Sequence, residues 1–434
     1  MKIKTISALE ILDSRGNPTI ASTVVLEDGS TGLASIPSGT STGKYEAVEL
    51  RDGDLKRYGG QGVLKAVENV NIKIAGTVVG MNAEEQENVD KKMIEVDGTK
   101  NKSNLGANAI LSVSLAVARA EASAEKKPLY HYLTKFNPYH KDSYTMPIPQ
   151  MNIMNGAKHA NWATDIQEYM IFPVGAKSEQ DAVRMCVEVY HQLQKELKAL
   201  GYPVTVGDEG GYAPRVQSNE EPFQRIKQAV DQLGYIFGKD FLIGIDAAAS
   251  EFFKEGMYHL NKEGKTLTVD ELLNFYQLLL QKYPIASIED PFDQDDWQGF
   301  KKLNQLKGDK IQIVGDDIYV TNIERLKMGI IEKATNSILI KLNQIGTLTE
   351  TVQAILLARQ NNMSSVVSHR SGETEDSFIA DFTVAMGVGQ IKAGAPARGE
   401  RTAKYNRLLQ IEKELGEIAV YAEFPFFNPG ITSL

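Results

Sequence analysis

Short apolar runs in the second half of the chain each end on an ionisable side chain, and this pattern constrains the fold most. The six end positions are Asp246, Glu289, Asp316, Lys341, His369 and Lys392. Brief apolar runs between longer helix-like stretches are typical of a parallel sheet that is buried on both faces. The intervals of 43, 27, 25, 28 and 23 residues between these positions fit the roughly 30 residues of a βα unit. The pattern therefore predicts an α/β fold, a closed (β/α)8 TIM-like barrel, with these side chains on its catalytic face.

Three of the six residues are acids without a cysteine or a paired-histidine motif nearby: Asp246, Glu289 and Asp316. An oxygen-only set of ligands favours magnesium or manganese over zinc. Each acid taken alone is more simply explained as a cap of the following helix. Three acids at successive strand ends favour a metal site instead.

Two lysines, Lys341 and Lys392, end apolar strands where an unpartnered ammonium group is costly. Nearby metal ions and burial would both lower the pKa of such a lysine toward values suited to a base. The alternative is a pair of salt bridges to the same acids. That alternative explains the burial of the lysines but not the gathering of two lysines and three acids on one face.

Two further segments are assigned to the same site. Residues 167–172 resemble another barrel strand that carries the polar pair Gln167 and Glu168. Residues 205–211 are predicted to be a strand end followed by a glycine-rich turn around Glu209, and glycines there let a carboxylate approach a ligand closely. A plain acidic turn explains Glu209 equally well.

A basic and hydroxyl pair, Arg370 and Ser371, follows His369 and precedes an amphipathic helix that begins near Phe378. The amino end of that helix would direct free N–H groups and a guanidinium at the pocket, which outlines a phosphate site. The alternative is a capped helix with an exposed arginine.

A competing motif lies near the amino terminus. Residues 39–43 (GTSTG) match the G-x-S-x-G nucleophile elbow of α/β-hydrolases, with Ser41 as the nucleophile. Pro37 and Ser38 interrupt the strand that should lead into such an elbow. The same stretch lacks the spacing of a phosphate-binding loop, and residues 387–392 lack the last glycine of a dinucleotide-binding fingerprint.

The first part of the chain has a different pattern. Residues 3–9, 19–26 and 31–36 are expected to form a three-stranded meander with a hairpin at Asp28-Gly29, and helical periodicity follows over residues 63–74 and 107–121. Strands followed by helices predict an α+β domain. We therefore expect an amino-terminal α+β capping domain over residues 1–138 and a catalytic barrel domain over residues 139–434.

Composition limits the classes of partner. The net charge is −9 with a pI near 5.4, and the basic residues are scattered, so we expect no nucleic acid as the main partner. The single cysteine, Cys186, allows no disulfide within the chain. The most apolar helical stretch is too short and too polar to span a membrane, and residues 1–4 lack the apolar run of a signal peptide. We expect a cytoplasmic protein.

Six longer motifs resemble the enolase family along essentially the whole chain. They are LDSRGNP at 12–18, SGTSTG at 38–43, GDEGGYAP at 207–214, SIEDP at 287–291, IKLNQIG at 340–346 and SHRSGETED at 368–376. The resemblance implies a lyase that reversibly dehydrates 2-phospho-D-glycerate to phosphoenolpyruvate and water in glycolysis and gluconeogenesis.

The same resemblance implies a role for each matching residue. Lys341 would be the base, and Glu209, helped by Glu168, the acid. Two Mg²⁺ ions would bind in each active site: the first at Asp246, Glu289 and Asp316, and the second with Ser41 on a closing loop. Substrate would be bound by His159, Gln167, His369, Arg370, Ser371 and Lys392.

The resemblance also implies a homo-oligomer, either a dimer or a ring of dimers, and a secondary pool of protein at the cell surface or secreted. Two alternatives to the enolase reaction stay open. An acid-sugar dehydratase of the same superfamily would share the barrel but not the Ser41 loop or the Arg370-Ser371 phosphate site. A surface binding protein that merely keeps the fold would not require Lys341, Glu209 and the metal acids.

Overall fold

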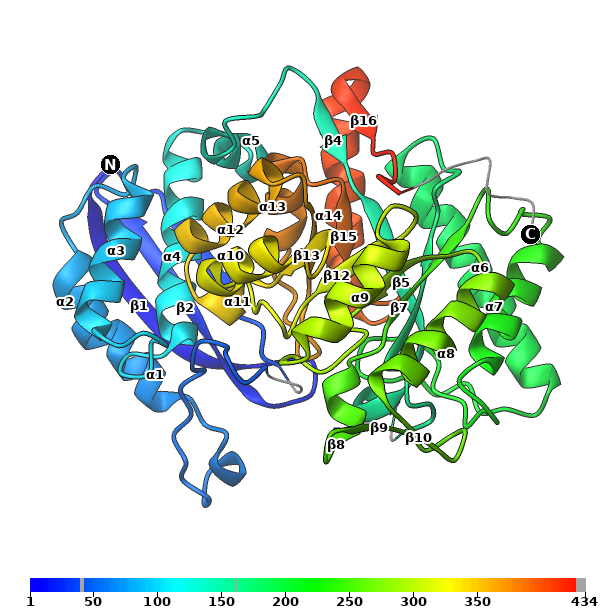
Figure 1. The fold of residues 1–434 in the computed structure, drawn as a ribbon. Coiled ribbons are helices and arrows are strands. Elements are labelled where there is room, and N and C mark those ends of the chain that lie inside the picture. The colour runs from blue at the N-terminus through cyan, green and yellow to red at the C-terminus, as the bar shows by residue number, and fades with distance from the viewer. Residues whose placement is uncertain (40–42, 161, 427–434) are drawn as a thin grey trace.

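The computed structural model describes residues 1–39, 43–160 and 162–426. The chain forms a three-stranded sheet with helices in its first third and a closed eight-stranded barrel in the remainder. Figure 1 shows the amino-terminal sheet and α1–α4 on one side of the barrel. The α/β fold class, with a barrel and a smaller amino-terminal domain, is confirmed. The boundary at residues 138 and 139 stays a prediction.

The amino-terminal sheet is the expected antiparallel meander, in the order β1-β2-β3. Helix α4 packs on one of its faces so closely that a Cβ added at Gly32 would lie 2.1 Å from the Ala116 carbonyl oxygen. The predicted helix over residues 63–74 forms as α1 and a π-helical segment, η2, and α2 continues it beyond residue 74. The bounds are β1 Ile3–Leu12, β2 Pro18–Leu26, β3 Thr31–Ser35, η1 Tyr58–Gly60, α1 Leu64–Glu68, η2 Asn69–Ile74, α2 Ala75–Val78, α3 Gln86–Asp97, α4 Ala107–Ala124, α5 Leu129–Leu133 and η3 Thr134–Phe136.

The barrel closes in the order β11-β12-β13-β14-β15-β5-β6-β7. Its strands are buried almost throughout, which explains why they read as continuous apolar runs. Gly244 in β7 is required by close packing, because an added Cβ would lie 2.3 Å from Phe172 Cζ. The bounds are β5 Ile148–Asn155, β6 Glu168–Phe172, β7 Leu242–Asp246, β11 Ile285–Glu289, β12 Gln312–Gly315, β13 Ser337–Ile340, β14 Ser364–Ser368 and β15 Gln390–Lys392.

Strand β6 departs from the regular all-parallel arrangement. It runs antiparallel to both neighbours, with Glu168 opposite Asn155 of β5 and Asp246 of β7. The amino end of β6 therefore lies at the carboxyl ends of the other strands. This reversal places Glu168 at the carboxyl-terminal rim of the barrel, where a parallel strand would have placed it at the opposite end.

Helices surround the barrel, and short elements extend its loops. The helices are α6 Glu179–Ala199, α7 Glu221–Gln232, α8 Val269–Lys282, α9 Trp297–Lys307, α10 Ile323–Glu332, α11 Leu342–Ile345, α12 Leu348–Gln360, α13 Phe378–Met386 and α14 Gly399–Leu415. The short elements are β4 Tyr144–Met146, η4 Ala157–Ala160, η5 Ala249–Phe252, β8 Phe253–Lys254, β9 Met257–Leu260, β10 Lys265–Leu267, η6 Gly416–Ile418 and β16 Ala419–Tyr421. No helix within the described ranges is long and apolar enough to cross a membrane.

The expected strand end at residues 205–206 is wrong. Only an isolated bridge joins Val206 to Tyr212, and the glycine-rich turn between them carries Glu209. The turn is fixed by backbone hydrogen bonds, including one from the Gly207 N–H to the Gly211 carbonyl. Glu209 thus reaches the barrel rim from an irregular loop and not from a strand.

Candidate active site

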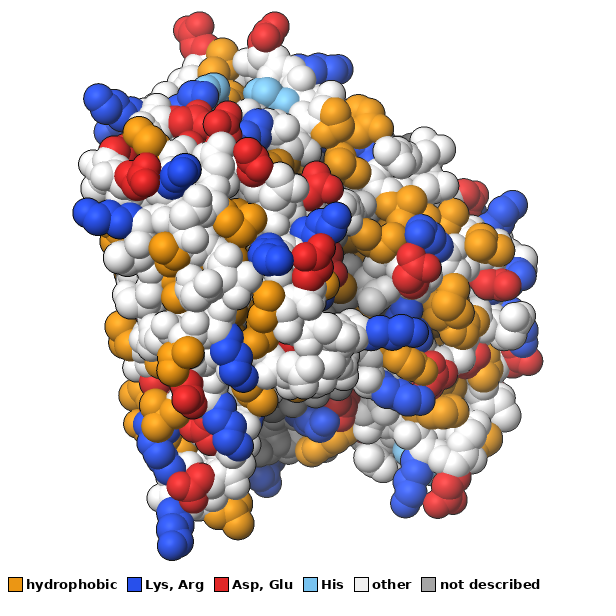
Figure 2. All heavy atoms as spheres, turned by 90° about the vertical axis from the view of Figure 1, so that its left-hand side faces the viewer, with side chains coloured by type: hydrophobic (Ala, Val, Ile, Leu, Met, Phe, Trp, Pro, Cys, Tyr) orange, Lys and Arg blue, Asp and Glu red, His pale blue; other side chains and the backbone are white. Residues whose placement is uncertain are grey.

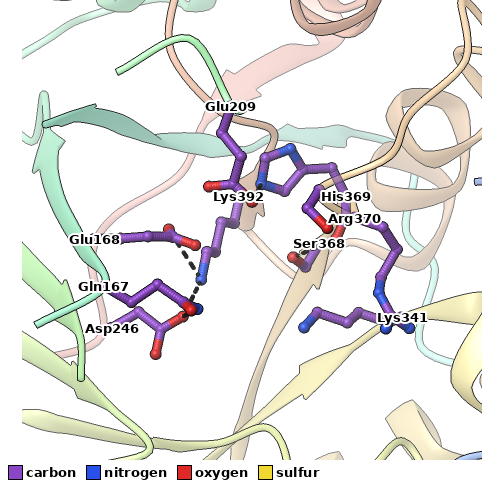
Figure 3. A pocket seen from close by; sticks show the side chains of 10 residues that line it. Gln167, Glu168, Glu209, Asp246, Lys341, Ser368, His369, Arg370 and Lys392 are labelled. Carbon is purple, nitrogen blue, oxygen red and sulfur yellow. Dashed lines mark hydrogen bonds and ion pairs between the residues drawn. The ribbon is translucent and has the colours of Figure 1, made fainter. Parts of the chain in front are cut away.

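A pocket opens at the catalytic end of the barrel and collects most of the residues that the sequence suggested. Its lining consists of Gln167, Glu168, Glu209, Asp246, Lys341, Ser368, His369, Arg370, Ser371 and Lys392. All of these except Ser368 were predicted site residues. Figure 3 shows Lys341 and Arg370 on one side, Gln167, Glu168 and Asp246 on the other, and Lys392 between them.

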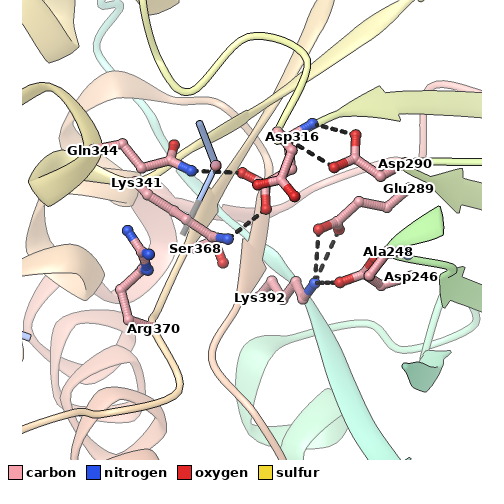
Figure 4. A network of polar contacts seen from close by, with 12 residues as sticks. Asp246, Ala248, Glu289, Asp290, Asp316, Lys341, Gln344, Ser368, Arg370 and Lys392 are labelled. Carbon is pink, nitrogen blue, oxygen red and sulfur yellow. Dashed lines mark hydrogen bonds and ion pairs between the residues drawn. The ribbon is translucent and has the colours of Figure 1, made fainter. Parts of the chain in front are cut away.

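Three acids share the ammonium group of Lys392. Its Nζ lies 2.9 Å from Glu289 Oε1, 3.1 Å from Glu168 Oε2 and 3.2 Å from Asp246 Oδ2. Glu289 is the direct neighbour of Asp246 in the β7–β11 register, which explains why the two carboxylates converge (Figure 4). Gln167 Nε2 also donates to Asp246 Oδ2, at 3.2 Å.

The third predicted metal ligand, Asp316, pairs with the second lysine. Lys341 Nζ donates to Asp316 Oδ2 at 2.5 Å, and Gln344 Nε2 donates to Asp316 Oδ1 at 2.9 Å (Figure 4). Asp316 directly follows β12 and Lys341 directly follows β13, so adjacent strands bring the pair together. The two lysines thus neutralise the acids from two sides of one cluster.

A neighbouring acid, Asp290, supports this cluster. Its carboxylate accepts the backbone N–H groups of Asp316 and Asp317 at 2.9 and 2.7 Å. These three acids have carboxylate oxygens within 4.8 Å of one another. Because both oxygens of Asp290 already accept backbone hydrogen bonds, we interpret it as the residue that positions Asp316 and not as a metal ligand. Buried carboxylates on adjacent strand ends are a donor set that fits a hard divalent cation.

Burial and charge act against each other in the cluster. Burial raises the pKa of Glu289 and Glu168 well above the usual value, and neighbouring acids add to the effect. Burial alone would raise the pKa of Asp316 as well, but the charge of Lys341 lowers it overall. The predicted lowering of both lysine pKa values depends on bound metal ions and stays a prediction. Burial does lower them, but the surrounding carboxylates outweigh it and raise the pKa of Lys341 and Lys392.

Glu209 lies on the other side of the pocket from Lys341. Its Oε2 accepts a hydrogen bond from Asn152 Nδ2 at 2.9 Å, and its Oε1 lies 3.6 Å from His369 Nε2. Burial lowers the pKa of His369 well below its usual value; the Glu209 carboxylate opposes this effect, and the cation Arg401 adds to it. His369 is therefore a neutral imidazole beside a carboxylate.

Arg370 presents its guanidinium to the pocket but already binds an acid. Nη1 and Nη2 contact the two carboxylate oxygens of Glu46 at 2.9 and 3.2 Å, and Nη1 also donates to Asn343 Oδ1 at 2.9 Å. The first N–H of the following helix is already engaged within the chain. Helix α13 begins at Phe378, as predicted, and the Phe378 N–H donates to Asp376, which pairs with Arg119 of the amino-terminal domain.

The nucleophile-elbow alternative lacks its structural context. The motif follows β3 of an antiparallel meander, and no helix forms between Gly43 and the turn at Tyr58 in the described part of that segment. Ser41 itself lies outside the described residues. His159 lies in η4, and its side chain is likewise outside the described part of the structure.

Sequence reasoning missed several residues that hold the site together. Gln344 and Asp290 lie inside the quoted motifs, so their positions beside Lys341 and Glu289 were available as signals. Glu46 and Arg401 come from a loop and a helix without any local pattern. Their roles follow from tertiary packing: Glu46 contacts Arg370, 324 positions along the chain, and Arg401 contacts His369, 32 positions before it.

Comparison with known families gives two matches. A family model described as "Enolase, N-terminal domain" matches residues 3–133. A second, described as "Enolase, C-terminal TIM barrel domain", matches residues 143–429. Together the two matches account for nearly the whole chain, in the order in which the structure places the sheet and the barrel.

Proposed function

The chain belongs to the enolase family, and on that premise we propose that it reversibly dehydrates 2-phospho-D-glycerate to phosphoenolpyruvate and water. One observation carries the proposal. A lysine, Lys341, and a pair of glutamates, Glu168 and Glu209, line the same pocket beside a buried set of carboxylates (Figure 3). Removal of a proton next to a carboxylate and loss of hydroxide need a base and an acid arranged in this way.

The carboxylates Asp246, Glu289 and Asp316 would hold Mg²⁺. When bound, such a cation would stabilise the charge that develops on the substrate carboxylate as the neighbouring proton leaves. The metal requirement is supported by the family and by the acidic cluster, whereas the identity of the ion as Mg²⁺, two per site, is part of the proposal. The pairing of a lysine base with magnesium in this superfamily is a known example of tuned acid and base chemistry.

Lys341 would take the α proton at its Nζ. It can do so only as the neutral amine, and the Asp316 carboxylate at 2.5 Å favours the charged form. A divalent cation at Asp316 would compete for that carboxylate and weaken its hold on Lys341. The protonation of Lys341 would therefore depend on whether a cation is bound at Asp316. Gln344 would keep the Asp316 carboxylate oriented in both states.

Glu209 would donate a proton to the departing hydroxyl group. Burial favours the protonated form of its neighbour Glu168, so a proton is available on this side of the pocket. Asn152 fixes the Glu209 carboxyl group, and Lys392 would bind the substrate carboxylate beside it. Gln167, His159 and His369 would complete the substrate pocket.

The substrate phosphate would bind Arg370 and Ser371. The fork of Arg370 matches phosphate geometry, and Glu46 occupies that fork with a carboxylate. A phosphate would therefore compete with Glu46 for the same guanidinium. This phosphate site separates the proposal from an acid-sugar dehydratase, whose substrates lack the phosphate group.

The remaining parts of the proposal concern the setting of the enzyme. We infer a cytoplasmic homo-oligomer, a dimer or a ring of dimers, with a capping domain of residues 1–138 and a catalytic domain of residues 139–434. Figure 2 shows basic and acidic side chains interspersed on the face it presents. That distribution supports the absence of nucleic acid as a main partner.

The test is the appearance of phosphoenolpyruvate, followed by its ultraviolet absorbance, from 2-phospho-D-glycerate. We expect activity with Mg²⁺, complete loss with EDTA, recovery when Mg²⁺ is restored, and no effect of a serine-directed phosphonate. Activity that survives EDTA and is lost to the phosphonate would contradict the proposal in favour of a hydrolase.

A further inference from the structure

Arg401 is a fully buried arginine with no part in the proposed reaction. It lies on α14 with 0% of its surface exposed. Its Nη1 donates to His369 Nδ1 and to the Arg370 carbonyl, both at 2.6 Å. Its Nη2 donates to the carbonyls of Ser371 at 2.6 Å and Asp208 at 3.1 Å. One side chain thus joins the turn that carries the pocket residue Glu209 to the segment that carries the pocket residues 369–371.

The partners of Arg401 are unusual for a buried cation. All four Nη hydrogens are directed at carbonyl oxygens or an imidazole nitrogen, and its ion pair among the described residues is a 3.5 Å contact from Nε to Glu400. Burying a charge costs free energy that neutral acceptors offset only in part. A neutral side chain would be a less costly way to fill the same space, which favours a specific role for the positive charge.

The contact with His369 determines where its proton lies. A guanidinium has only donors, so Nδ1 of His369 must be the acceptor and carry a lone pair. A neutral imidazole then has its hydrogen on Nε2, the nitrogen that lies 3.6 Å from Glu209 Oε1. The tautomer of His369 follows from its partner and needs no assumption about the reaction.

We propose that Arg401 is a positioning residue that holds His369 as the neutral Nε2–H tautomer and ties the Glu209 turn to the Arg370-Ser371 segment. His369 would then present a hydrogen-bond donor, and neither a base nor a cation, to the acid side of the pocket. The effect on turnover rests on the proposed function, whereas the tautomer does not.

Packing around Gly394 supports a tightly fixed arrangement. Gly394 has a φ of +85°, and an added Cβ would lie 2.8 Å from both Arg401 Cδ and the Glu209 carbonyl oxygen, and 3.1 Å from His369 Cε1. The Ala395 N–H donates to the same Glu209 carbonyl at 2.9 Å. Arg401, Glu209 and His369 therefore meet at one backbone position that leaves no room for a side chain.

The first test reads the tautomer directly in the wild-type protein. With ¹⁵N-labelled histidine, NMR distinguishes protonated from unprotonated ring nitrogens, and His369→Gln identifies the signal among the six histidines. We expect an unprotonated Nδ1 and a protonated Nε2 from about pH 6 to about pH 8. A protonated Nδ1, or a doubly protonated ring in that range, would overturn the proposal.

The second test compares variants of Arg401 with a matched arginine. Arg401→Met should permit both tautomers and lower kcat by roughly ten- to a hundredfold, and Arg401→Lys should restore part of the Nε2–H signal. Arg407→Met, on the same helix and paired with the buried Asp381, should leave the His369 signal unchanged. A folded Arg401→Met protein with the wild-type tautomer and kcat would show that Arg401 has only a structural role, and would refute the proposal.

The two claims fail separately. If Arg401→Met does not fold, the wild-type spectrum alone still decides the tautomer. If the wild-type protein shows the Nε2–H tautomer but no dehydration of 2-phospho-D-glycerate, the proposed function is rejected and the assignment of His369 stands.

Discussion

Two buried aspartates in different regions of the molecule have opposite surroundings. Asp316 at the barrel mouth lies beside Lys341, and its pKa is lowered in spite of burial. Among the described residues, the donors to Asp90 on α3 are neutral: Gln86 Nε2 at 3.0 Å, the Ser114 hydroxyl, and the N–H and hydroxyl of Thr349 on α12 at 3.0 and 2.6 Å. Burial there raises the pKa of Asp90 to about 6.

Asp316 and Asp90 are both buried, but their pKa values shift in opposite directions, so burial alone does not decide whether a carboxylate is ionised. At Asp316 the charge of Lys341 outweighs burial, because a cation stabilises the charged form that burial penalises, whereas at Glu289 and Glu168, which share one lysine with Asp246, burial prevails. The barrel mouth therefore holds charges at some cost in stability, as a functional site does. At the junction between the domains, the Asp90 carboxyl group links α3 to α12 through hydrogen bonds.

The largest expected effect is at the barrel mouth. Glu289→Gln removes one of the acids that share Lys392, so activity should fall by roughly a hundred- to a thousandfold. In EDTA the variant should unfold at the same temperature as wild type or higher, because a costly buried charge is gone. Thermal unfolding with and without Mg²⁺ measures both effects.

Mg²⁺ should raise the unfolding temperature of the wild-type protein by binding the folded state, and it should fail to raise that of Glu289→Gln. Glu332→Gln, which alters a surface pair with Lys301, serves as the control and should keep the shift. If Mg²⁺ still raises the unfolding temperature of Glu289→Gln, Glu289 is not a metal ligand. The contrast between the barrel mouth and the junction at Asp90 would then be wrong.

A smaller effect, on stability alone, is expected at the junction. The folded pKa of Asp90, about 6, lies above the usual 3.8, so the native state binds a proton more readily than the unfolded state. The stabilisation is complete below about pH 4 and is lost as pH rises through 6, a fall of up to about 3 kcal/mol in the free energy of unfolding. Asp90→Asn should abolish this fall, with kcat unchanged.

Denaturant unfolding of both proteins between about pH 4 and pH 7 provides the measurement. The free energy of unfolding of Asp90→Asn should rise relative to wild type over that interval. Parallel curves would mean that Asp90 ionises as easily in the folded as in the unfolded protein. The contrast with Asp316 would then be lost.

The smallest effect on activity and stability is expected at solvent-exposed ion pairs. Lys302 and Asp270 form an exposed pair between α9 and α8, with side chains 46% and 73% accessible. Lys302→Gln should change neither activity nor the unfolding temperature measurably, because solvent screens such pairs. A clear loss of stability in a thermal scan would show that surface pairs here contribute as much as the buried ones.

The strand ends were predictable from sequence because a buried strand must be apolar, so an ionisable residue marks the point where it reaches the rim. That logic located Asp246, Glu289, Lys341 and Lys392 correctly. It failed for the direction of β6, because a short buried run carries no signal of orientation. The assignment of Glu168 to the site came from the polar pair in its strand-like segment and from the family resemblance.

Residues that act through tertiary contacts gave no local signal. Asp90 and Arg401 each lie within an ordinary helical pattern, and their burial becomes evident only when α12 and the 369–371 segment pack against them. The helix after Arg370 begins at Phe378 as predicted, but the sequence does not show that Asp376 accepts the Phe378 N–H and pairs with Arg119. Local patterns do not report which distant element completes a hydrogen bond.

The most direct test of the proposed reaction separates its two proton transfers. In deuterated water with Mg²⁺, wild type should exchange the α proton of 2-phospho-D-glycerate. Lys341→Ala should lose both exchange and turnover. Glu209→Gln should lose turnover by at least on the order of a hundredfold yet retain exchange, because the base is intact. Lys327→Ala, an exposed lysine on α10, should match wild type. Exchange at the wild-type rate in Lys341→Ala would contradict the account, because the proton would then leave to another group.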